Sequence, residues 1–161
     1  MNENVCCFTG HREIGDDLTV ERIKIAIEKM IEDGVDTFIS GGAVGFDTLA
    51  GFAVHELKEK HPHIKLHIYV PCKNQDYKFS AQQKRDYKRL LEIADLVKES
   101  DAPPSKQAFL ARDRRMVDDS GRCICYLNKP TGGTAYTVRY AISKGITSLN
   151  VAVRKANKSA R

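Results

Sequence analysis

The chain has 161 residues, of which 42% are hydrophobic and 29% are charged, as in one soluble globular domain. No apolar run approaches the roughly 18 residues of a membrane span, and a strand-like run begins so early that we expect no signal peptide and a cytoplasmic protein. The formal charge is +5, but the last eight residues carry four of the cations and no acid, which leaves a body near +1. We therefore predict a domain over residues 1–153 and a basic, disordered tail over residues 154–161.

Short apolar runs and amphipathic segments alternate along the chain. Thr19 is expected to cap the first helix, because apolar residues with helical spacing follow it, and Gly34 suits its end. Ser80 and Gln83 have the spacing of a capping box, which predicts the start of the third helix. We expect helices at residues 20–34, 47–60, 81–94, 106–121 and 135–145, and strands at 5–10, 36–40, 65–72, 94–100, 122–127 and 148–153.

The order of these elements indicates the fold class. The predicted strands are almost continuously apolar, and a helix separates each from the next, which is typical of a mostly parallel sheet that is covered on both faces. The sequence therefore predicts a single-domain α/β protein with a Rossmann-like, doubly wound, mostly parallel sheet and helices on both faces.

Three glycine-bearing turns follow predicted strands: "TGHR" at 9–12, "SGGAVGFD" at 40–47 and "PTGGT" at 130–134. Open parallel sheets bind ligands outside the carboxyl ends of their strands, so the fold is expected to gather the three turns at one edge. Glycine frees the backbone to approach a phosphate, and the helix that follows adds partial positive charge. The alternative is a set of tight turns that use glycine for backbone reasons alone.

Four segments in this order, "CCFTGHR", "SGGAVGFDTLA", "RDRRMVDDSG" and "PTGGTAYTVRYA", resemble the YpsA-like branch of the SLOG superfamily over roughly residues 5–151. The second segment is also similar to the DNA-processing protein DprA and, more distantly, to LOG phosphoribohydrolases. The resemblance implies a Rossmann-like fold and a nucleotide-type ligand such as NAD or ADP-ribose. By family analogy it also implies a homodimer and a partner in bacterial cell division.

The sequence departs from both distant relatives at one position each. When the glycine pair of the LOG pattern is matched to Gly132 and Gly133, Arg139 stands where the catalytic Glu of that pattern belongs. Gly51 stands where DprA-like chains usually have a His. The function of neither relative therefore transfers directly.

The expected ligand-binding residues lie mainly on the three turns. Three of these residues also have an interpretation without a ligand. His11 is alternatively a structural or exposed residue, and Thr134 a helix cap. Arg115, which the family pattern favours as a site residue, is alternatively part of a solvated helix face. Arg12 offers a planar fork for phosphate or carboxylate. The expected ligand-binding set is Thr9, Gly10, His11, Arg12, Ser40, Gly41, Gly42, Ala43, Gly45, Arg115, Gly132, Gly133 and Thr134.

Asp47 is the candidate catalytic residue. As a cap at the start of a helix it would contribute about 0.5–2 kcal/mol. Alternatively, its carboxylate bonds ribose hydroxyls or positions a water at the anomeric carbon, or it forms an ion pair with Arg12. These alternatives stay open at the level of the sequence.

Three functions follow from these patterns. The first is a nucleotide-binding module with a sensing or regulatory role, and the second is a hydrolase of an N-glycosidic or phosphoribosyl bond that uses Asp47. The third, binding of single-stranded DNA, needs a basic strip with stacking aromatics, whereas the chain has no Trp and 7% aromatic residues. Nucleic acid is therefore not the expected partner. The five cysteines lie in or beside apolar runs and are expected to be buried thiols, with a metal or redox pair as the alternative and no metal site predicted.

Overall fold

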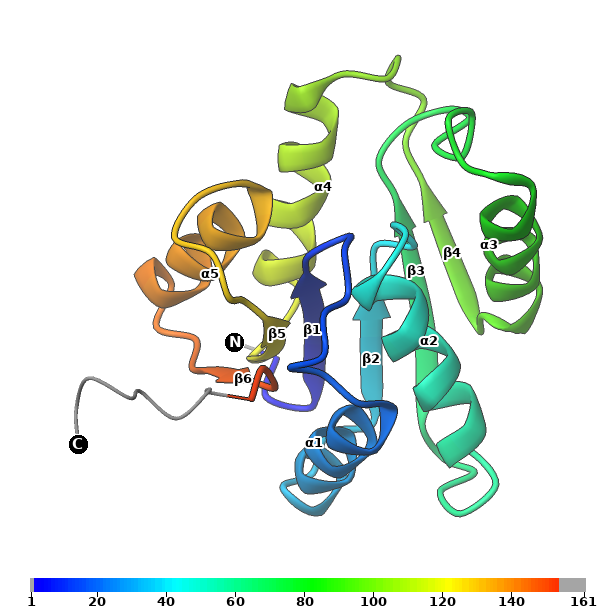
Figure 1. Cartoon of the computed structure of the whole chain (residues 1–161). Helices are drawn as coiled ribbons and strands as arrows, with labels where there is room; N and C mark the ends of the chain where they lie inside the picture. The colour runs from blue at the N-terminus through cyan, green and yellow to red at the C-terminus, as the bar shows by residue number, and fades with distance from the viewer. Residues whose placement is uncertain (1, 154–161) are drawn as a thin grey trace.

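The computed structural model describes residues 2–153, so the predicted basic tail lies outside the described part of the chain. Six strands form one sheet in the order β4-β3-β2-β1-β5-β6, and every neighbouring pair is parallel. The order reverses between β1 and β5 (Figure 1). The strands are β1 Val5–Gly10, β2 Thr37–Ser40, β3 Lys65–Val70, β4 Leu96–Glu99, β5 Arg122–Tyr126 and β6 Ser148–Asn150.

Five helices cover the two faces of the sheet, which confirms the predicted doubly wound α/β class. One apolar core joins the inner sides of α1, α2 and α3 to one face, and a second core joins α4 and α5 to the other. Figure 1 shows this separation, with α4 and α5 apart from α1 and α2. The helices are α1 Val20–Glu32, α2 Phe46–Leu57, α3 Ala81–Ile93, α4 Lys106–Asp118 and α5 Gly133–Ser143.

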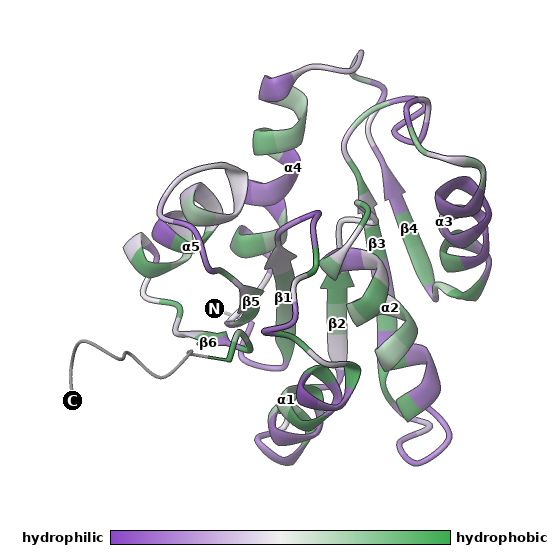
Figure 2. Cartoon of the chain, in the orientation of Figure 1, coloured by the Kyte–Doolittle hydropathy of each residue, from purple (hydrophilic) through white to green (hydrophobic). Residues whose placement is uncertain are grey.

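Alternation along β1 explains how the sheet fills both cores. Cys6 and Phe8 point into the core of α1 to α3, whereas Cys7 points into the core of α4 and α5. Figure 2 shows that β2 and β3 are mainly hydrophobic, while α3 is largely hydrophilic on its outer turns. All five cysteines are buried and free, as the apolar runs predicted. Among the described residues no helix is both long and apolar enough to cross a membrane.

The helices begin in two different ways. Hydroxyl side chains cap α1, α3 and α4: Thr19 accepts from the Arg22 N–H, Ser80 and Gln83 form the predicted capping box, and Ser105 accepts from the Ala108 N–H. By contrast, α2 and α5 begin at glycines, and no side chain bonds their first N–H groups. These two helices therefore start without a side-chain cap, although the Phe46 N–H donates to the His11 carbonyl, and both follow predicted glycine turns.

The sheet is shorter at its edges than predicted. The third strand ends at Val70 rather than at residue 72, and β4 spans four residues rather than seven. The last strand ends at Asn150, because the following segment leaves the sheet edge: the Val153 N–H donates to the Asp17 carbonyl. These differences concern strand ends and leave the topology unchanged.

Candidate functional site

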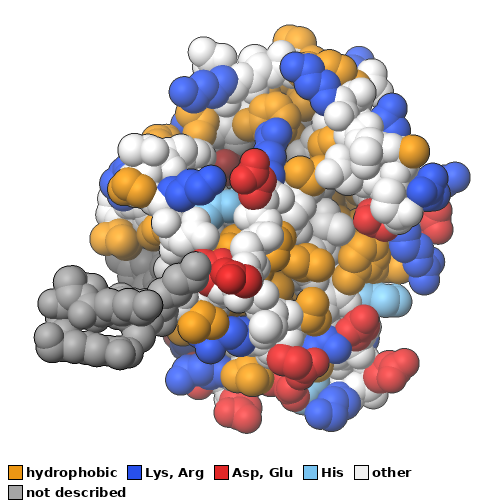
Figure 3. All heavy atoms as spheres, in the orientation of Figure 1, with side chains coloured by type: hydrophobic (Ala, Val, Ile, Leu, Met, Phe, Trp, Pro, Cys, Tyr) orange, Lys and Arg blue, Asp and Glu red, His pale blue; other side chains and the backbone are white. Residues whose placement is uncertain are grey.

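A cavity of about 530 Å³ lies at the point where the strand order reverses. It opens beyond the carboxyl end of β1, between the first turns of α2, α4 and α5, which is where open α/β sheets bind ligands. Figure 3 shows basic, acidic and histidine side chains gathered on this face of the molecule. The lining residues are Phe8, Thr9, Gly10, His11, Arg12, Ala43, Asp47, Lys106, Phe109, Leu110, Arg112, Asp113, Gly133 and Thr134.

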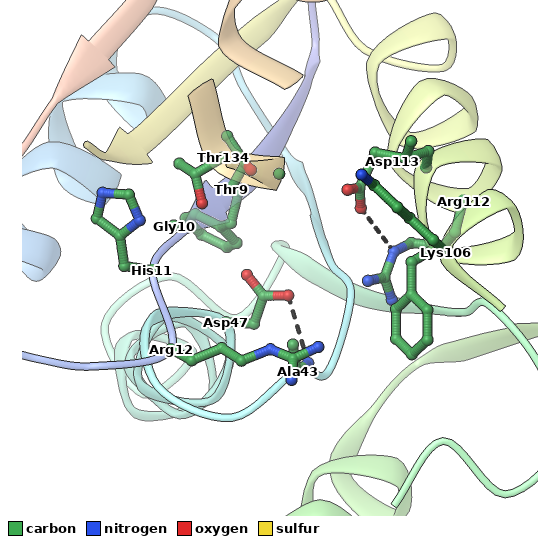
Figure 4. Close-up of a pocket in the computed structure, with 14 residues that line it drawn as sticks. Thr9, Gly10, His11, Arg12, Ala43, Asp47, Lys106, Arg112, Asp113 and Thr134 are labelled. Atoms are coloured by element: carbon green, nitrogen blue, oxygen red, sulfur yellow. Dashed lines mark hydrogen bonds and ion pairs between the residues drawn. The ribbon is translucent and has the colours of Figure 1, made fainter. Parts of the chain in front are cut away.

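Eight of the residues predicted from the sequence line this cavity together. They come from three distant parts of the chain, as the expected meeting of the three glycine turns requires (Figure 4). The eight are Thr9, Gly10, His11, Arg12, Ala43, Asp47, Gly133 and Thr134. Six others lie outside the lining: Ser40, Gly41, Gly42, Gly45, Arg115 and Gly132. Their role in binding a ligand stays a prediction.

Two of these residues shape the turn between β2 and α2. Ser40 is fully buried; its hydroxyl donates to the Asp47 carbonyl at 2.9 Å and accepts from the Gly42 N–H at 3.2 Å. Gly45 has φ +83°, and a Cβ there would lie 2.2 Å from the Arg12 carbonyl oxygen. The turn therefore needs glycine at residue 45 because the loop after β1 passes directly against it.

The turn before α5 has a different environment. Gly132 has φ +101° and is the N-cap, so Thr134, the second residue of the helix, is not its cap. A Cβ added at Gly132 or at Gly133 would meet no atom within 4 Å. Open space therefore lies at the Cβ positions of both glycines, and Gly133 and Thr134 border the cavity.

Asp47 projects from the first turn of α2 into the cavity, where it is 6% exposed (Figure 4). It is not the N-cap, which is Gly45, but its Oδ2 accepts from the Ala43 N–H at 3.3 Å. Burial raises the pKa of Asp47 to about 7; Arg112 opposes this increase, and the Asp113 carboxylate adds to it. The described residues show no ion pair between Asp47 and Arg12, whose guanidinium lies over the Phe109 ring at 5.9 Å.

Arg112 is one of six lining residues that the sequence reasoning missed. It is 3% exposed, and its Nη1 donates to the carbonyls of Gly41 at 2.6 Å and Tyr69 at 3.0 Å. Its Nε donates to Asp113 Oδ1 at 2.8 Å, so a carboxylate balances the buried charge. The spacing of four residues between Ala108, Arg112 and Met116, the buried stripe of α4, was the signal that could have identified it.

His11 is tied into the fold by both backbone and side chain. Its N–H donates to the Tyr126 carbonyl at 3.4 Å, and its carbonyl accepts from the Phe46 N–H at 3.2 Å. The ring Nε2 accepts from the Asn128 N–H at 3.0 Å. Burial, helped by Lys129, lowers the pKa of His11, so the neutral ring with the hydrogen on Nδ1 is favoured at neutral pH.

Gly45 and Gly132, which both have positive φ, are expected to differ in the cost of substitution. Gly132→Ala is expected to lower the free energy of unfolding by about 1–3 kcal/mol, because only the backbone conformation is strained. Gly45→Ala adds a collision with the Arg12 carbonyl and is expected to cost clearly more, or to prevent folding. Urea denaturation of the two variants measures the difference, and equal costs would contradict the close approach.

The raised pKa of Asp47 predicts a pH-dependent stability. The fold favours the protonated carboxyl, so its contribution is complete below about pH 4 and is lost as the pH rises towards 7. Asp47→Asn, a neutral isostere, should match the wild type near pH 4 and exceed it by about 2–4 kcal/mol at pH 8. Urea denaturation between pH 4 and pH 8 tests this prediction, and Asp101→Asn, at an exposed position, is the matched control. A constant difference between Asp47→Asn and wild type would contradict the prediction.

Solved structures with similar folds are DNA processing proteins. DprA from Streptococcus pneumoniae superposes with a TM-score of 0.67 at 20% identity, over 89% of this chain and 48% of the pneumococcal one. DNA processing protein A from Helicobacter pylori, which binds single-stranded DNA, also gives 0.67 at 18% identity, over 97% of this chain and 68% of the other. This chain thus spans about half of the pneumococcal protein, and the likeness shows the fold alone.

Sequence relatives cover most of the chain. The SPbeta prophage-derived protein YoqJ of Bacillus subtilis is 35% identical over 136 residues, which cover 75% of this chain and 78% of YoqJ. The UPF0398 protein OB1025 of Oceanobacillus iheyensis is 31% identical over 129 residues, covering 75% and 69%. The model of the YspA SLOG family matches residues 6–152. The glycine turns, the reversal of strand order and this match lead to one conclusion: the chain belongs to the YpsA family of SLOG proteins.

Proposed function

We propose that the chain is a nucleotide-binding module, with a ligand of the NAD or ADP-ribose type whose phosphate lies between the first turns of α2 and α5. One observation carries the proposal: of the three helices that border the cavity, α2 and α5 begin without a side-chain cap, whereas Ser105 caps α4. The Phe46 N–H of α2 donates to the His11 carbonyl, but no side chain caps either helix. The helix dipoles and the remaining N–H groups of the first turns favour an anion at that place. We include a sensing or regulatory role in the proposal, because this is the role of a module that binds a nucleotide and leaves it unchanged.

The charged side chains around the cavity support an anionic ligand. Arg12 and Lys106 line it, and neither has a carboxylate partner within ion-pair distance among the described residues. Arg112 is different, because Asp113 and two carbonyls already hold its guanidinium. Arg12 and Lys106 are thus the cations that a phosphate would meet.

A substitution at Gly133 separates ligand binding from folding. The site has room for a side chain, and an acid in the first turn of a helix is stabilising, so Gly133→Asp is expected to keep or raise the melting temperature. The carboxylate of Gly133→Asp repels a phosphate, and we therefore expect its affinity for ADP-ribose to fall at least about tenfold. Gly133→Ala is the uncharged control. Thermal shift and calorimetry with NAD, ADP-ribose, AMP and ribose 5-phosphate make the test. Unchanged affinity in Gly133→Asp would contradict the proposal.

A second candidate is the hydrolysis of an N-glycosidic bond, with Asp47 as the acid. The specific observation is a buried carboxyl in the cavity with a pKa near 7, which suits proton transfer at neutral pH, opposite the Arg112-bound carboxylate of Asp113. In this reaction, water and the nucleotide give the free base and ribose phosphate, and the Asp47 carboxyl supplies the proton to the leaving base.

Chromatography of incubations with AMP and NAD tests this second candidate. Release of free base by the wild type, and its loss in Asp47→Asn but not in the exposed-site control Ile142→Ala, is the expected result if the chain is a hydrolase. A ligand that stabilises the protein and is recovered intact leaves the binding module as the function.

A further inference from the structure

A second cavity, of about 330 Å³, adjoins the first. The two share four lining residues, Arg12, Ala43, Lys106 and Phe109, so one ligand can extend from one into the other. The second cavity lies between the start of α4 and the loop that joins β3 to α3. Its other lining residues are Val44, Gln75, Tyr77, Lys78, Phe79, Gln83, Pro104 and Ser105.

Aromatic side chains form much of the wall of the second cavity. Tyr77 and Phe79 come from the loop before α3, and Phe109 comes from α4. Tyr77 is 56% exposed, and the Lys78 Nζ lies over its ring at 5.4 Å from the centroid. Phe79 is braced edge-on against Tyr87, with ring centroids 5.8 Å apart. The wall thus offers flat apolar surface next to the polar first cavity.

Phe109 stands at the junction of the two cavities. The guanidinium of Arg12 lies over its ring at 5.9 Å from the centroid, and that of Arg112 lies at 5.7 Å. Two cations on one ring fix the position of the side chain and place positive charge where the cavities meet. The cations of the second cavity are Arg12, Lys78 and Lys106, and none of its described lining residues is Asp or Glu.

Gln75 couples the aromatic loop to the glycine turn of the first cavity. Its side chain is 4% exposed; its Nε2 donates to the Gly41 carbonyl at 3.2 Å, and its Oε1 accepts from Arg112 Nη1 at 3.3 Å. The loop that carries Tyr77 and Phe79 is therefore held in a fixed position relative to the first cavity. A buried amide with both ends bonded specifies geometry more strongly than an apolar contact does.

We propose that the second cavity holds the nucleobase of the ligand, packed against Tyr77, Phe79 and Phe109, while the phosphate lies in the first cavity. The inference rests on the proposed function and adds to it the class of group that the ligand carries at its other end, a flat aromatic heterocycle. Base–aromatic stacking tolerates different bases. Gln83 lies at the wall; its Oε1 accepts from the Ser80 N–H in the capping box, and its Nε2 is a donor for a base edge.

Calorimetry with AMP, GMP and ribose 5-phosphate tests this assignment. We expect the wild type to bind at least one of the two mononucleotides about tenfold or more tightly than ribose 5-phosphate. Tyr77→Ala should lose most of that advantage and keep its affinity for ribose 5-phosphate. Because Tyr77 is exposed, the variant should melt with the wild type; Ile142→Ala, on the 63% exposed side chain of α5, is the control for loss of a large surface residue. Phe79→Leu, which keeps the apolar volume, is the second variant.

The outcomes distinguish this inference from the function on which it rests. If ribose 5-phosphate binds and the mononucleotides bind no better, the phosphate site stands and the base site is wrong. If Tyr77→Ala weakens all three probes equally, the residue acts on the fold and the inference is overturned. If no probe binds the wild type, the proposed function fails and this inference with it. Oligothymidylate that binds more tightly with increasing length, and depends on Tyr77, would assign the aromatic wall to single-stranded DNA and contradict a mononucleotide site.

Discussion

The geometry of the cavity depends on the contacts of the buried Arg112 guanidinium. It joins α4, from one side of the sheet, to the carbonyls of Gly41 and Tyr69 at the ends of β2 and β3. A buried cation is tolerated only when its donors and its charge are satisfied, and Asp113, two carbonyls and Gln75 do this here. A Cβ at Gly41 would lie 2.7 Å from the Arg112 Cζ, so this glycine makes room for the guanidinium.

The same arrangement explains why the cavity combines acidic and basic groups. A Cβ at Gly41 would also lie 2.8 Å from Asp47 Oδ2, so the Asp47 carboxylate and the Arg112 guanidinium lie beside the same glycine. Asp47 has no ion pair that fixes its charge, and burial therefore dominates its pKa. The cavity therefore contains the Asp47 carboxyl, whose pKa is raised, and the Asp113 carboxylate, which forms an ion pair with Arg112. Such a pair suits a site that contacts both the phosphate and the hydroxyl groups of a nucleotide.

Local patterns in the sequence were sufficient to predict the fold and the edge where the site lies. Apolar strands, the Thr19 cap and the Ser80 capping box depend on neighbours in the chain, and the structure has them as predicted. The parallel topology then brings the glycine turns together. Arg112 was missed because its partners lie 43 and 71 residues away and are backbone carbonyls, which leave no pattern of residue types. Phe109 was missed for a related reason: it meets Tyr77 only through the loop that Gln75 holds.

The most direct measurement is a titration of the ¹⁵N-labelled protein with ADP-ribose, followed by amide chemical shifts. The account predicts that the largest changes fall at residues 43–47, which span the glycine turn and the start of α2, and at residues 133–135, at the start of α5, because these segments border the proposed phosphate site. Changes confined to other surfaces, such as the outer face of α3, or no changes at millimolar ligand, would contradict the claim that the reversal of strand order holds a nucleotide phosphate.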